Sequence, residues 1–371
     1  MDAVYRQGCR TPKDQRRLVS TRKTPPKRAT KARDIRPKSH AVESKGASAS
    51  REFTVTKWLG DLKDIELAYS TRLGASLVGQ SENALGSVSG DALRGRIQLV
   101  FTSPPFPLNR KKRYGNLEGE KFRDWLAGYA DLLTNLLTAD GSIVLEMGNA
   151  WEPGIPVMST LGMESLLAFK RAAGLHLCQE FVWFNPARLP TPAAWVTVKR
   201  LRVKDAFTRV WWLSKTPYPK ADNARVLQPY SGAMKSLLER GSYNAGLRPS
   251  QHRISNKSFL RDHGGAIPPN VLDLESRLLN NVLVEGNTSS RSDYRNYCKE
   301  VGLDPHPAMM PISLARFFIS LCTTEGDIVL DPFAGSNTTG VAAEQLSRQW
   351  ISIEATKTYA ESGRGHFPDL R

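Results

Sequence analysis

Two short loops, more than 200 residues apart, carry the residue types that could do chemistry: TSPPF at 102–106 and DPFAGSNTTG at 331–340. The first contains four residues suited to holding an amine, namely Ser103, Pro104, Pro105 and Phe106. The serine hydroxyl and the carbonyl of the first proline accept hydrogen bonds, the second proline stiffens the turn, and the aromatic ring can stack on a base. Two such acceptors can hold both hydrogens of an exocyclic amine while its nitrogen attacks a methyl group. A Pro-Cys nucleophile motif is absent, which argues against methylation at C5 of cytosine.

The second loop has the form of a strand, a tight glycine turn and a helix start. Gly335 lets the backbone approach a ligand closely, and the N–H groups at Ser336–Thr338 begin a helix and can bind it. Glu354 ends the next apolar run, where a carboxylate can accept hydrogen bonds from both ribose hydroxyls of a nucleoside. A P-loop would need GxxxxGK[ST] and a dinucleotide site GxGxxG, and the sequence has neither. The pattern favours a cofactor without phosphate, such as S-adenosylmethionine.

Both loops follow apolar runs that are typical of buried parallel strands, and ligands of open α/β sheets bind at the carboxyl ends of such strands. We expect strands at 75–78, 97–101, 142–147, 175–184, 206–213, 327–333 and 350–354. Apolar residues at helical spacing predict helices at 120–138, 160–173, 311–323 and 338–347. This alternation predicts an α/β fold, a Rossmann-like arrangement with a mostly parallel, twisted sheet covered by helices.

Composition divides the chain into four parts. Residues 1–50 form a basic tail that we expect to be disordered, because 1–51 holds 15 Lys/Arg against 4 Asp/Glu and few apolar residues. Three interpretations are open: an arm that binds nucleic acid, a solvated tail, or residues that are not translated because the start codon was assigned too far upstream. Residues 51–214 are the catalytic part of the main domain and 305–371 its cofactor-binding part. Residues 215–304 are rich in Pro, Gly, Asn, Ser and basic residues, which indicates a region for target recognition.

Several classes of protein are disfavoured by composition. No apolar run approaches the ~18 residues that a membrane span needs, and the first residues lack the apolar core of a secretory signal. The four cysteines (Cys9, Cys178, Cys298 and Cys322) are scattered and form no CxxC pair, so we expect neither a metal site nor disulfides. The formal charge of +16 indicates a nucleic-acid partner. We expect a cytoplasmic protein that does not bind membranes.

With these residues in hand, the chain resembles the S-adenosylmethionine-dependent amino-methyltransferases of DNA. DPFAGSNTTG resembles their cofactor motif, and HPAMMP at 306–311 resembles the segment that precedes it. The order of catalytic loop, variable region and cofactor loop is that of the beta class. Five more segments are similar to cytosine-N4 enzymes of that class: SPPFPLNRKKRYGN, WFNPARLPTPAAW, RVKDA, VWWLSKT and GGAIPPN. The likeness spans roughly residues 65–360.

The resemblance implies a cofactor site made by Gln80, His306, Pro307, Asp331, Phe333, Gly335, Ser336, Asn337, Thr338 and Glu354. One position departs from the family. An aspartate commonly follows the glycine of the first turn, whereas this chain has Gln80, whose amide carbonyl can accept the same hydrogen bond from adenine without a charge. We therefore expect weaker cofactor affinity rather than inactivity. Serine rather than aspartate at 103 favours cytosine N4 over adenine N6.

The resemblance also implies duplex DNA as substrate, with the target base flipped out of the helix. Candidates for DNA contacts are Arg110, Lys111, Lys112 and Arg113 after the catalytic turn, and Arg248, Arg253, Lys257 and Arg261 in the variable region. We expect a site-specific cytosine-N4 methyltransferase of a restriction-modification system, acting as a monomer on a short palindrome, with CAGCTG as the best single expectation. A companion endonuclease would act on the same site and need not bind. Methylation of adenine N6, or a non-catalytic DNA-binding protein with the same fold, remain alternatives.

Overall fold

The computed structural model describes residues 54–59, 65–105, 117, 119–273 and 287–370, with side chains left out for 273 and 287–292. The chain divides into two units, Met1–Arg51 and Glu52–Arg371, and the described residues all belong to the second. The basic tail predicted for 1–50 therefore lies outside the described residues. Within this part of the chain, no helix is both long and apolar enough to span a membrane.

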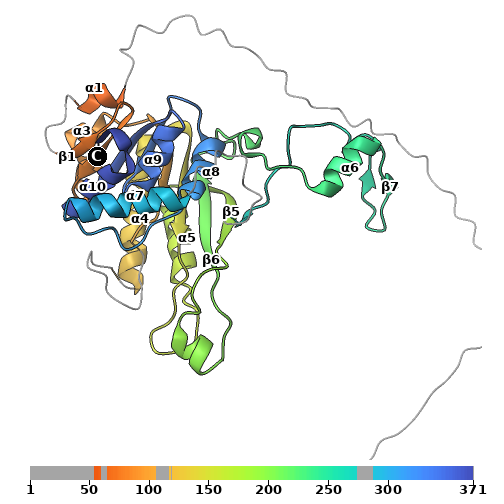
Figure 1. Cartoon of the computed structure of the whole chain (residues 1–371), viewed down its shortest axis with the longest axis horizontal. Coiled ribbons are helices and arrows are strands. Elements are labelled where there is room, and N and C mark those ends of the chain that lie inside the picture. Colours follow the sequence, from red (N-terminus) through yellow and green to blue (C-terminus); the bar gives the residue numbers. More distant parts are fainter. Residues whose placement is uncertain (1–53, 60–64, 106–116, 118, 274–286, 371) are drawn as a thin grey trace, which may run out of the picture. The chain divides into compact units, whose positions relative to one another are not determined.

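The centre of the described chain is a nine-stranded sheet (Figure 1). Its strands follow the order β1-β2-β11-β10-β3-β4-β6-β5-β9. Their bounds are β1 Glu66–Ser70, β2 Gly74–Val78, β3 Ile97–Thr102, β4 Leu137–Met147, β5 His176–Phe184, β6 Phe207–Ser214, β9 Val271–Asp273, β10 Ile328–Asp331 and β11 Gln349–Glu354. Neighbours from β2 to β4 are parallel, as are β5 and β9, whereas β1 and β6 run antiparallel to their neighbours. This arrangement confirms the predicted mostly parallel α/β sheet.

Helices cover both faces of the sheet because its central strands are apolar on both sides. Val100 and Leu330 pack in one core, against α1 (Val55–Leu59), α2 (Ser81–Gly86), α4 (Gly119–Leu136) and α5 (Leu161–Ala172). Phe101 and Val329 are the sequence neighbours of Val100 and Leu330 and point to the opposite face of the sheet. They pack in a second core against α8 (Ile312–Cys322), α9 (Thr338–Gln345) and α10 (Lys357–Ser362). A short helix α3 (Val88–Asp91) follows α2. The alternation of neighbouring residues between two cores holds the strand ends in a fixed register.

Two predicted boundaries were wrong. The helix predicted to reach residue 138 ends at Leu136, and β4 begins at once, so that Asp140 lies within the strand instead of ending the helix. Pairing explains this early start, because Leu137 pairs with the first residue of β3 and the Thr138 hydroxyl donates to Gln98 at 2.9 Å. The strand predicted for 327–333 ends at Asp331, since the proline that follows has no N–H for the ladder.

The region 215–304, predicted to be irregular, holds more structure than expected. It contains η2 (Asn223–Val226), α6 (Gly232–Arg240), β7 (Gly246–Leu247), β8 (Arg253–Ile254), β9 and α7 (Asn287–Glu300). β9 is an edge strand of the central sheet. In α7, the hydroxyl of the fully buried Tyr294 lies 2.9 Å from that of Ser362. The ends of this region thus pack with the main domain, and the segment with α6, β7 and β8 lies between them.

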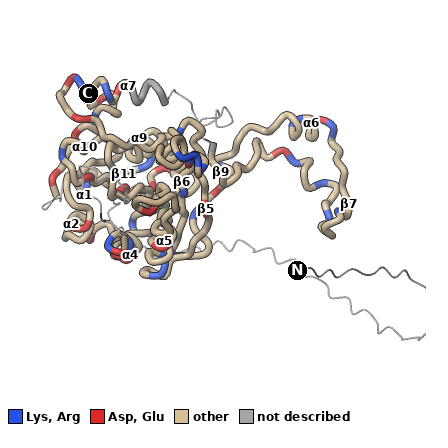
Figure 2. The backbone as a smooth tube through the Cα atoms, turned by 90° about the horizontal axis from the view of Figure 1, so that it is seen from below, with Lys and Arg blue, Asp and Glu red and all other residues tan. Residues whose placement is uncertain are grey.

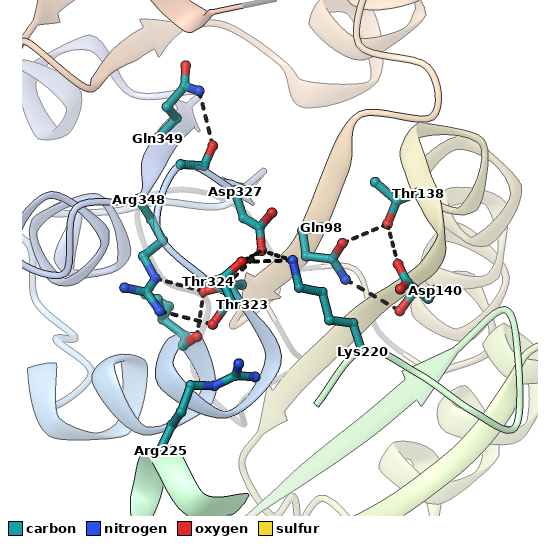
Figure 3. Close-up of polar contacts among 12 residues, drawn as sticks. Gln98, Thr138, Asp140, Lys220, Arg225, Thr323, Thr324, Asp327, Arg348 and Gln349 are labelled. Carbon is teal, nitrogen blue, oxygen red and sulfur yellow. Dashed lines mark hydrogen bonds and ion pairs between the residues drawn. The ribbon is translucent and has the colours of Figure 1, made fainter. Parts of the chain in front are cut away.

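Three cations, two of them in this region, hold elements of the fold together (Figure 3). Lys220 forms an ion pair of 2.6 Å with Asp327, just before β10. Arg225 donates to the carbonyls of Ser320 and Leu321 at the end of α8, at 2.8 and 2.9 Å. Arg348 donates to the carbonyl of Thr323, the C-cap residue of α8, at 2.9 Å. Arg225 and Arg348 offset unpaired carbonyls at the C-terminus of α8, and Lys220 offsets the charge of Asp327, so all three have a structural role.

Candidate active site

The catalytic and cofactor loops are brought together because β3 and β10 are neighbours in the sheet. Asp331, which is 3% exposed at the end of β10, joins them directly. One of its carboxylate oxygens accepts a hydrogen bond from the Thr102 hydroxyl at 2.6 Å, and the other accepts one from Thr339 at 2.6 Å. The strand that leads into TSPPF is thereby fastened to the loop DPFAGSNTTG.

A cavity of about 640 Å³ opens where the two loops meet. The predicted residues that line it are Gln80, Ser103, Pro104, Pro105, His306, Pro307, Asp331, Phe333, Gly335, Ser336, Thr338 and Glu354. Phe106 lies outside the described residues. Among the described residues, the structure thus gathers the predicted catalytic and cofactor residues, Asn337 excepted, around one space large enough for a small-molecule ligand.

Ser103 has a partner that the sequence pattern did not reveal. Its hydroxyl donates to the carboxylate of Glu146 at 2.5 Å, and Glu146 also lines the cavity. Glu146 lies near the carboxyl end of β4, the parallel neighbour of β3, and is only 8% exposed. The signal in the sequence is an acid within the apolar run at 143–147, at the end of the strand that adjoins the catalytic one. With its hydrogen committed to Glu146, Ser103 presents oxygen lone pairs as its free hydrogen-bonding capacity.

The glycine turn leaves space that a larger residue would fill. Gly335 has a φ of +53°, and a Cβ placed on it would lie 3.0 Å from the ring of His306. That ring packs edge-on against Tyr359, and the backbone N–H of His306 donates to the Tyr294 hydroxyl at 2.9 Å. The HPAMMP segment is therefore held in place by Tyr294 of α7 and by Tyr359. A side chain larger than that of glycine at position 335 would collide with the His306 ring.

Glu354 lies at the end of β11 and supports the turn from the other side. Its two carboxylate oxygens accept hydrogen bonds from the N–H groups of Gly335 and Thr356, both at 2.9 Å. A carboxylate has about four acceptor sites, so two remain for a ligand in the cavity that it lines. The expected ribose contact fits this arrangement.

Asn337 is placed differently from the other predicted cofactor residues. It has a φ of +65° and caps α9, and its carbonyl oxygen accepts from the N–H of Gly340 at 3.0 Å and from Ser352 at 2.5 Å. Its amide nitrogen donates to Tyr69 at 2.8 Å. The side chain is therefore buried beneath the loop, 1% exposed, and does not line the cavity. The sequence placed this residue in the right loop but could not tell which way the side chain points.

Three aromatic side chains pack together beside the cofactor loop. The ring of Phe333 packs against Trp125 and Tyr129 of α4, with centroids 5.5 and 5.2 Å apart. The indole of Trp125 donates to Glu82 at 2.9 Å. Burial acts to raise the pKa of Glu82, but hydrogen bonds from Tyr129, its own backbone and Trp125 outweigh it and lower the pKa. Phe333, Trp125 and an ionised Glu82 thus line the cavity with both flat apolar surface and an acceptor.

Comparison with known proteins gives these features a family. The sequence profile of the N6/N4 DNA methylase family matches residues 97–364, which include both loops. The chain belongs to this family. It is 42% identical to the type II methyltransferase M.PvuII of Proteus hauseri over 304 residues, which cover 81% of this chain and 86% of that protein.

Further comparisons agree with this family. The solved structure of the PvuII DNA methyltransferase (cytosine-N4-specific) superimposes with a TM-score of 0.62 and 36% identity, over 82% of this chain and 89% of that one. The DNA adenine methyltransferase YhdJ of Escherichia coli is 45% identical over only 58 residues, 16% of this chain and 20% of that protein. The likeness to the PvuII enzyme and the fold expected from the sequence are confirmed.

This DNA methylase is a type II methyltransferase, and S-adenosylmethionine is the methyl donor of its family. The residues around the cavity fit that cofactor. The glycine turn has room for close approach of a ligand, Glu354 keeps free acceptor sites, and Phe333 offers a flat face. Among the described residues, no cluster of His, Cys, Asp and Glu is arranged to hold a metal ion.

Gln80 gives a direct test of the cofactor site in this methylase. It lines the cavity and is the N-cap residue of α2, but its side chain makes no capping hydrogen bond, so the amide is available to a ligand. A charged acceptor forms a hydrogen bond stronger by about 1 kcal/mol. Gln80→Asp is therefore expected to tighten binding of S-adenosylmethionine about fivefold, as measured by calorimetry. Gln80→Asn, of the same shape but uncharged, should not tighten it; equal gains in both variants would contradict the assignment.

Asp331 predicts how stability depends on pH. Burial raises the pKa of this carboxyl from 3.8 to about 6, although Thr102, Thr339 and the Phe333 N–H oppose the rise. Between those pH values the unfolded chain loses its proton before the folded one does. This group therefore lowers the free energy of unfolding by about 3 kcal/mol as the pH rises through the window. Asp331→Asn should remove that decrease, measured as the difference between variant and wild type in urea unfolding from pH 4 to 7. A difference that stays constant with pH would refute the shift.

The described residues among those predicted to contact DNA do not line the cavity. Arg110, Lys111, Lys112 and Arg113 lie outside the described residues. Arg253, Lys257 and Arg261 are exposed, and Arg248 is half-buried and donates to the carbonyl of Asn244 at 2.8 Å. They belong to the segment of α6, β7 and β8, in which Figure 2 shows several basic positions. Their role in binding DNA stays a prediction.

Proposed function

We propose that this methylase transfers a methyl group to the exocyclic N4 of cytosine in a short palindromic site of duplex DNA. The observation that carries the proposal is the Ser103 hydroxyl, held by Glu146 at 2.5 Å in the cavity shared with the cofactor loop. The similarity to a cytosine-N4-specific enzyme over most of the chain supports the choice of base.

The amine of cytosine is a poor nucleophile because its lone pair is delocalised into the ring. Ser103 Oγ and the carbonyl of Pro104 would accept hydrogen bonds from its two hydrogens, which localises the lone pair on nitrogen. Glu146 orients the serine, since the hydroxyl donates to it and so turns its lone pairs to the amine. When the nitrogen sheds a proton, Ser103 can take it while passing its own to Glu146. No covalent bond to the protein is needed.

The cofactor supplies an electrophilic methyl group on a sulfonium centre. Glu354 would bind its ribose hydroxyls, Phe333 would pack on its adenine, and the turn at Gly335 admits it close to the backbone. The buried Asp331 fixes this loop relative to Ser103 through Thr102. The fixed distance between the two loops is the means by which donor and acceptor are aligned.

The wider biological role follows from the same similarity. A cytosine reaches this cavity only if it is flipped out of the duplex. We infer that the enzyme works as a cytoplasmic monomer that modifies each strand of a palindrome in turn, in a restriction-modification system. CAGCTG is the site to test first, and a companion endonuclease would cut the same site when it is unmodified.

The experiment is a nucleoside analysis. Purified protein and S-adenosylmethionine are incubated with DNA containing CAGCTG, the DNA is digested, and the nucleosides are identified by mass spectrometry. The proposal expects N4-methylcytosine, and sequencing of modified bases then reports the context. N6-methyladenine alone would favour the adenine alternative. Transfer to no DNA of any sequence would favour a binding protein that keeps the fold.

A further inference from the structure

The connection between β5 and β6, residues 185–206, begins beside the cavity and has a surface that the mechanism above does not use (Figure 1). β5 and β4 both pair antiparallel with β6, so the carboxyl end of β5 lies at the same edge of the sheet as that of β4 and β3. Trp183 and Arg188, around the start of this connection, line the cavity. The β5–β6 connection is therefore rooted where a flipped base must enter.

Its apolar side chains are unusually exposed. The exposed fractions are 73% for Leu189, 75% for Val198, 64% for Leu201 and 88% for Val203. Such side chains gain nothing from folding when they stay in water, and their concentration on one short connection marks a surface that contacts something else.

A neighbouring loop extends this surface. The loop after β4 places Ile155 and Val157 in solvent, 48% and 50% exposed. Arg202 joins the two loops, because its guanidinium stacks 3.4 Å from the ring centroid of Trp151 and donates to the carbonyl of Pro156 at 3.1 Å. The β5–β6 connection is thus held against the loop after β4 through Arg202.

The charge of the connection is almost entirely positive. It holds five Lys/Arg and one acid, Asp205, whose two oxygens both accept from Asn149, at 2.8 and 3.0 Å. Within the described part of the chain, no ion pair joins any of the five cations to an acid. Lys199 lies over the ring of Trp195 at 4.4 Å, and Arg200 is exposed beside it.

We propose that the β5–β6 connection docks on duplex DNA next to the flipped base. Lys199 and Arg200 contact phosphates, while Val198, Leu201 and Val203 pack into the groove. Cations without acidic partners suit a polyanion, and proteins that distort duplexes insert apolar side chains between their cations. A protein partner would have to cover these charges with acids of its own. The inference rests on the proposed function, because it requires that the cavity receives a base from DNA.

The test compares two pairs of charge removals. Lys199→Gln/Arg200→Gln is measured against Arg72→Gln/Arg171→Gln, which removes two exposed cations, one just before the start of β2 and one at the end of α5 before β5. Binding to a labelled duplex is titrated at several salt concentrations. The first variant should bind more weakly, and its plot of log Kobs against log salt should be shallower by about 2, whereas the control keeps the wild-type slope. Binding of S-adenosylmethionine should match wild type in both.

A second variant separates apolar contact from charge. Val198→Ser/Val203→Ser should weaken DNA binding about fivefold without a change in salt slope, because no phosphate contact is lost. Wild-type affinity and slope in both variants would overturn the inference while leaving the methyltransferase intact. Unchanged DNA binding with loss of self-association in sedimentation would assign the surface to a second copy and also overturn it. A wild-type protein that binds no DNA would reject the proposed function itself, and this inference with it.

Discussion

Ser103→Ala is expected to lower kcat for methyl transfer by about 10²–10³-fold, with affinities for DNA and S-adenosylmethionine within twofold of wild type. The hydroxyl is an acceptor in this cavity that the fold holds in place through a buried carboxylate, Glu146, at 2.5 Å. Its removal leaves the amine with the Pro104 carbonyl alone. Single-turnover transfer of a labelled methyl group to duplex DNA measures the effect.

Glu146 should act through Ser103, and the pair can be tested as a unit. Glu146→Gln keeps the shape but lets the amide donate to the serine, which turns the hydroxyl hydrogen toward the substrate. Its kcat should fall without a change in KM, and adding Ser103→Ala should cost little more, because the residues share one role. Additive losses would show that they act separately.

Ser81→Ala is the matched control for this pair. It removes a hydroxyl from the same cavity, but one that lies 3.2 Å from the Tyr129 hydroxyl on α4. The catalytic rate of this variant should stay close to wild type. A loss as large as that of Ser103→Ala would mean that any change in the cavity wall impairs transfer, and the assigned role of Ser103 would fall.

Gly335→Ala is expected to weaken S-adenosylmethionine binding by about tenfold or more, a second large effect. The left-handed backbone, with a φ of +53°, costs an alanine about 1 kcal/mol. In addition, the new Cβ lies 3.0 Å from the His306 ring, so the ring or the loop must shift. Either shift moves the walls of the cofactor site.

Gly95→Ala isolates the backbone contribution. Gly95 has a φ of +67°, but no atom lies within 4 Å of where its Cβ would be. Gly95→Ala should lose a few degrees in Tm for a domain of this size, and Gly335→Ala at least as much, because it also forces a shift at His306. Only the variant at 335 should lose cofactor affinity, as measured by calorimetry. Equal cofactor affinity in the two variants would contradict the idea that the close approach of Gly335 and His306 shapes the cofactor site.

The main lines of the fold and the site could be predicted because they depend on local patterns. Apolar runs ending in proline or glycine indicate buried strands that stop at a ligand edge, and β3 and β10 do so. Which strands pair with one another cannot be read from such local patterns. Glu146 is one acid near the end of a strand, and only the pairing of β3 with β4 shows that it reaches Ser103.

Side-chain direction and short elements could not be predicted. Asn337 belongs to the motif, yet the left-handed backbone at this position turns its amide inward to cap α9. β9 has three residues, too few for a period-2 pattern to be recognised, and it is a strand only because β5 offers it an edge. Both depend on contacts distant in sequence, which a pattern along the chain does not contain.

The order of strands has a consequence for how the enzyme is made. β10 and β11 lie between β2 and β3 in the sheet, although they come much later in the chain. Until they emerge, the earlier strands form two separate groups with open edges, and pairing across such a sequence distance is slow. A nascent or truncated chain therefore has a catalytic loop but no cofactor loop beside it. Pairing of β10 with β3 therefore does two things at once: it joins the two groups of strands and sets the cofactor loop beside the catalytic loop.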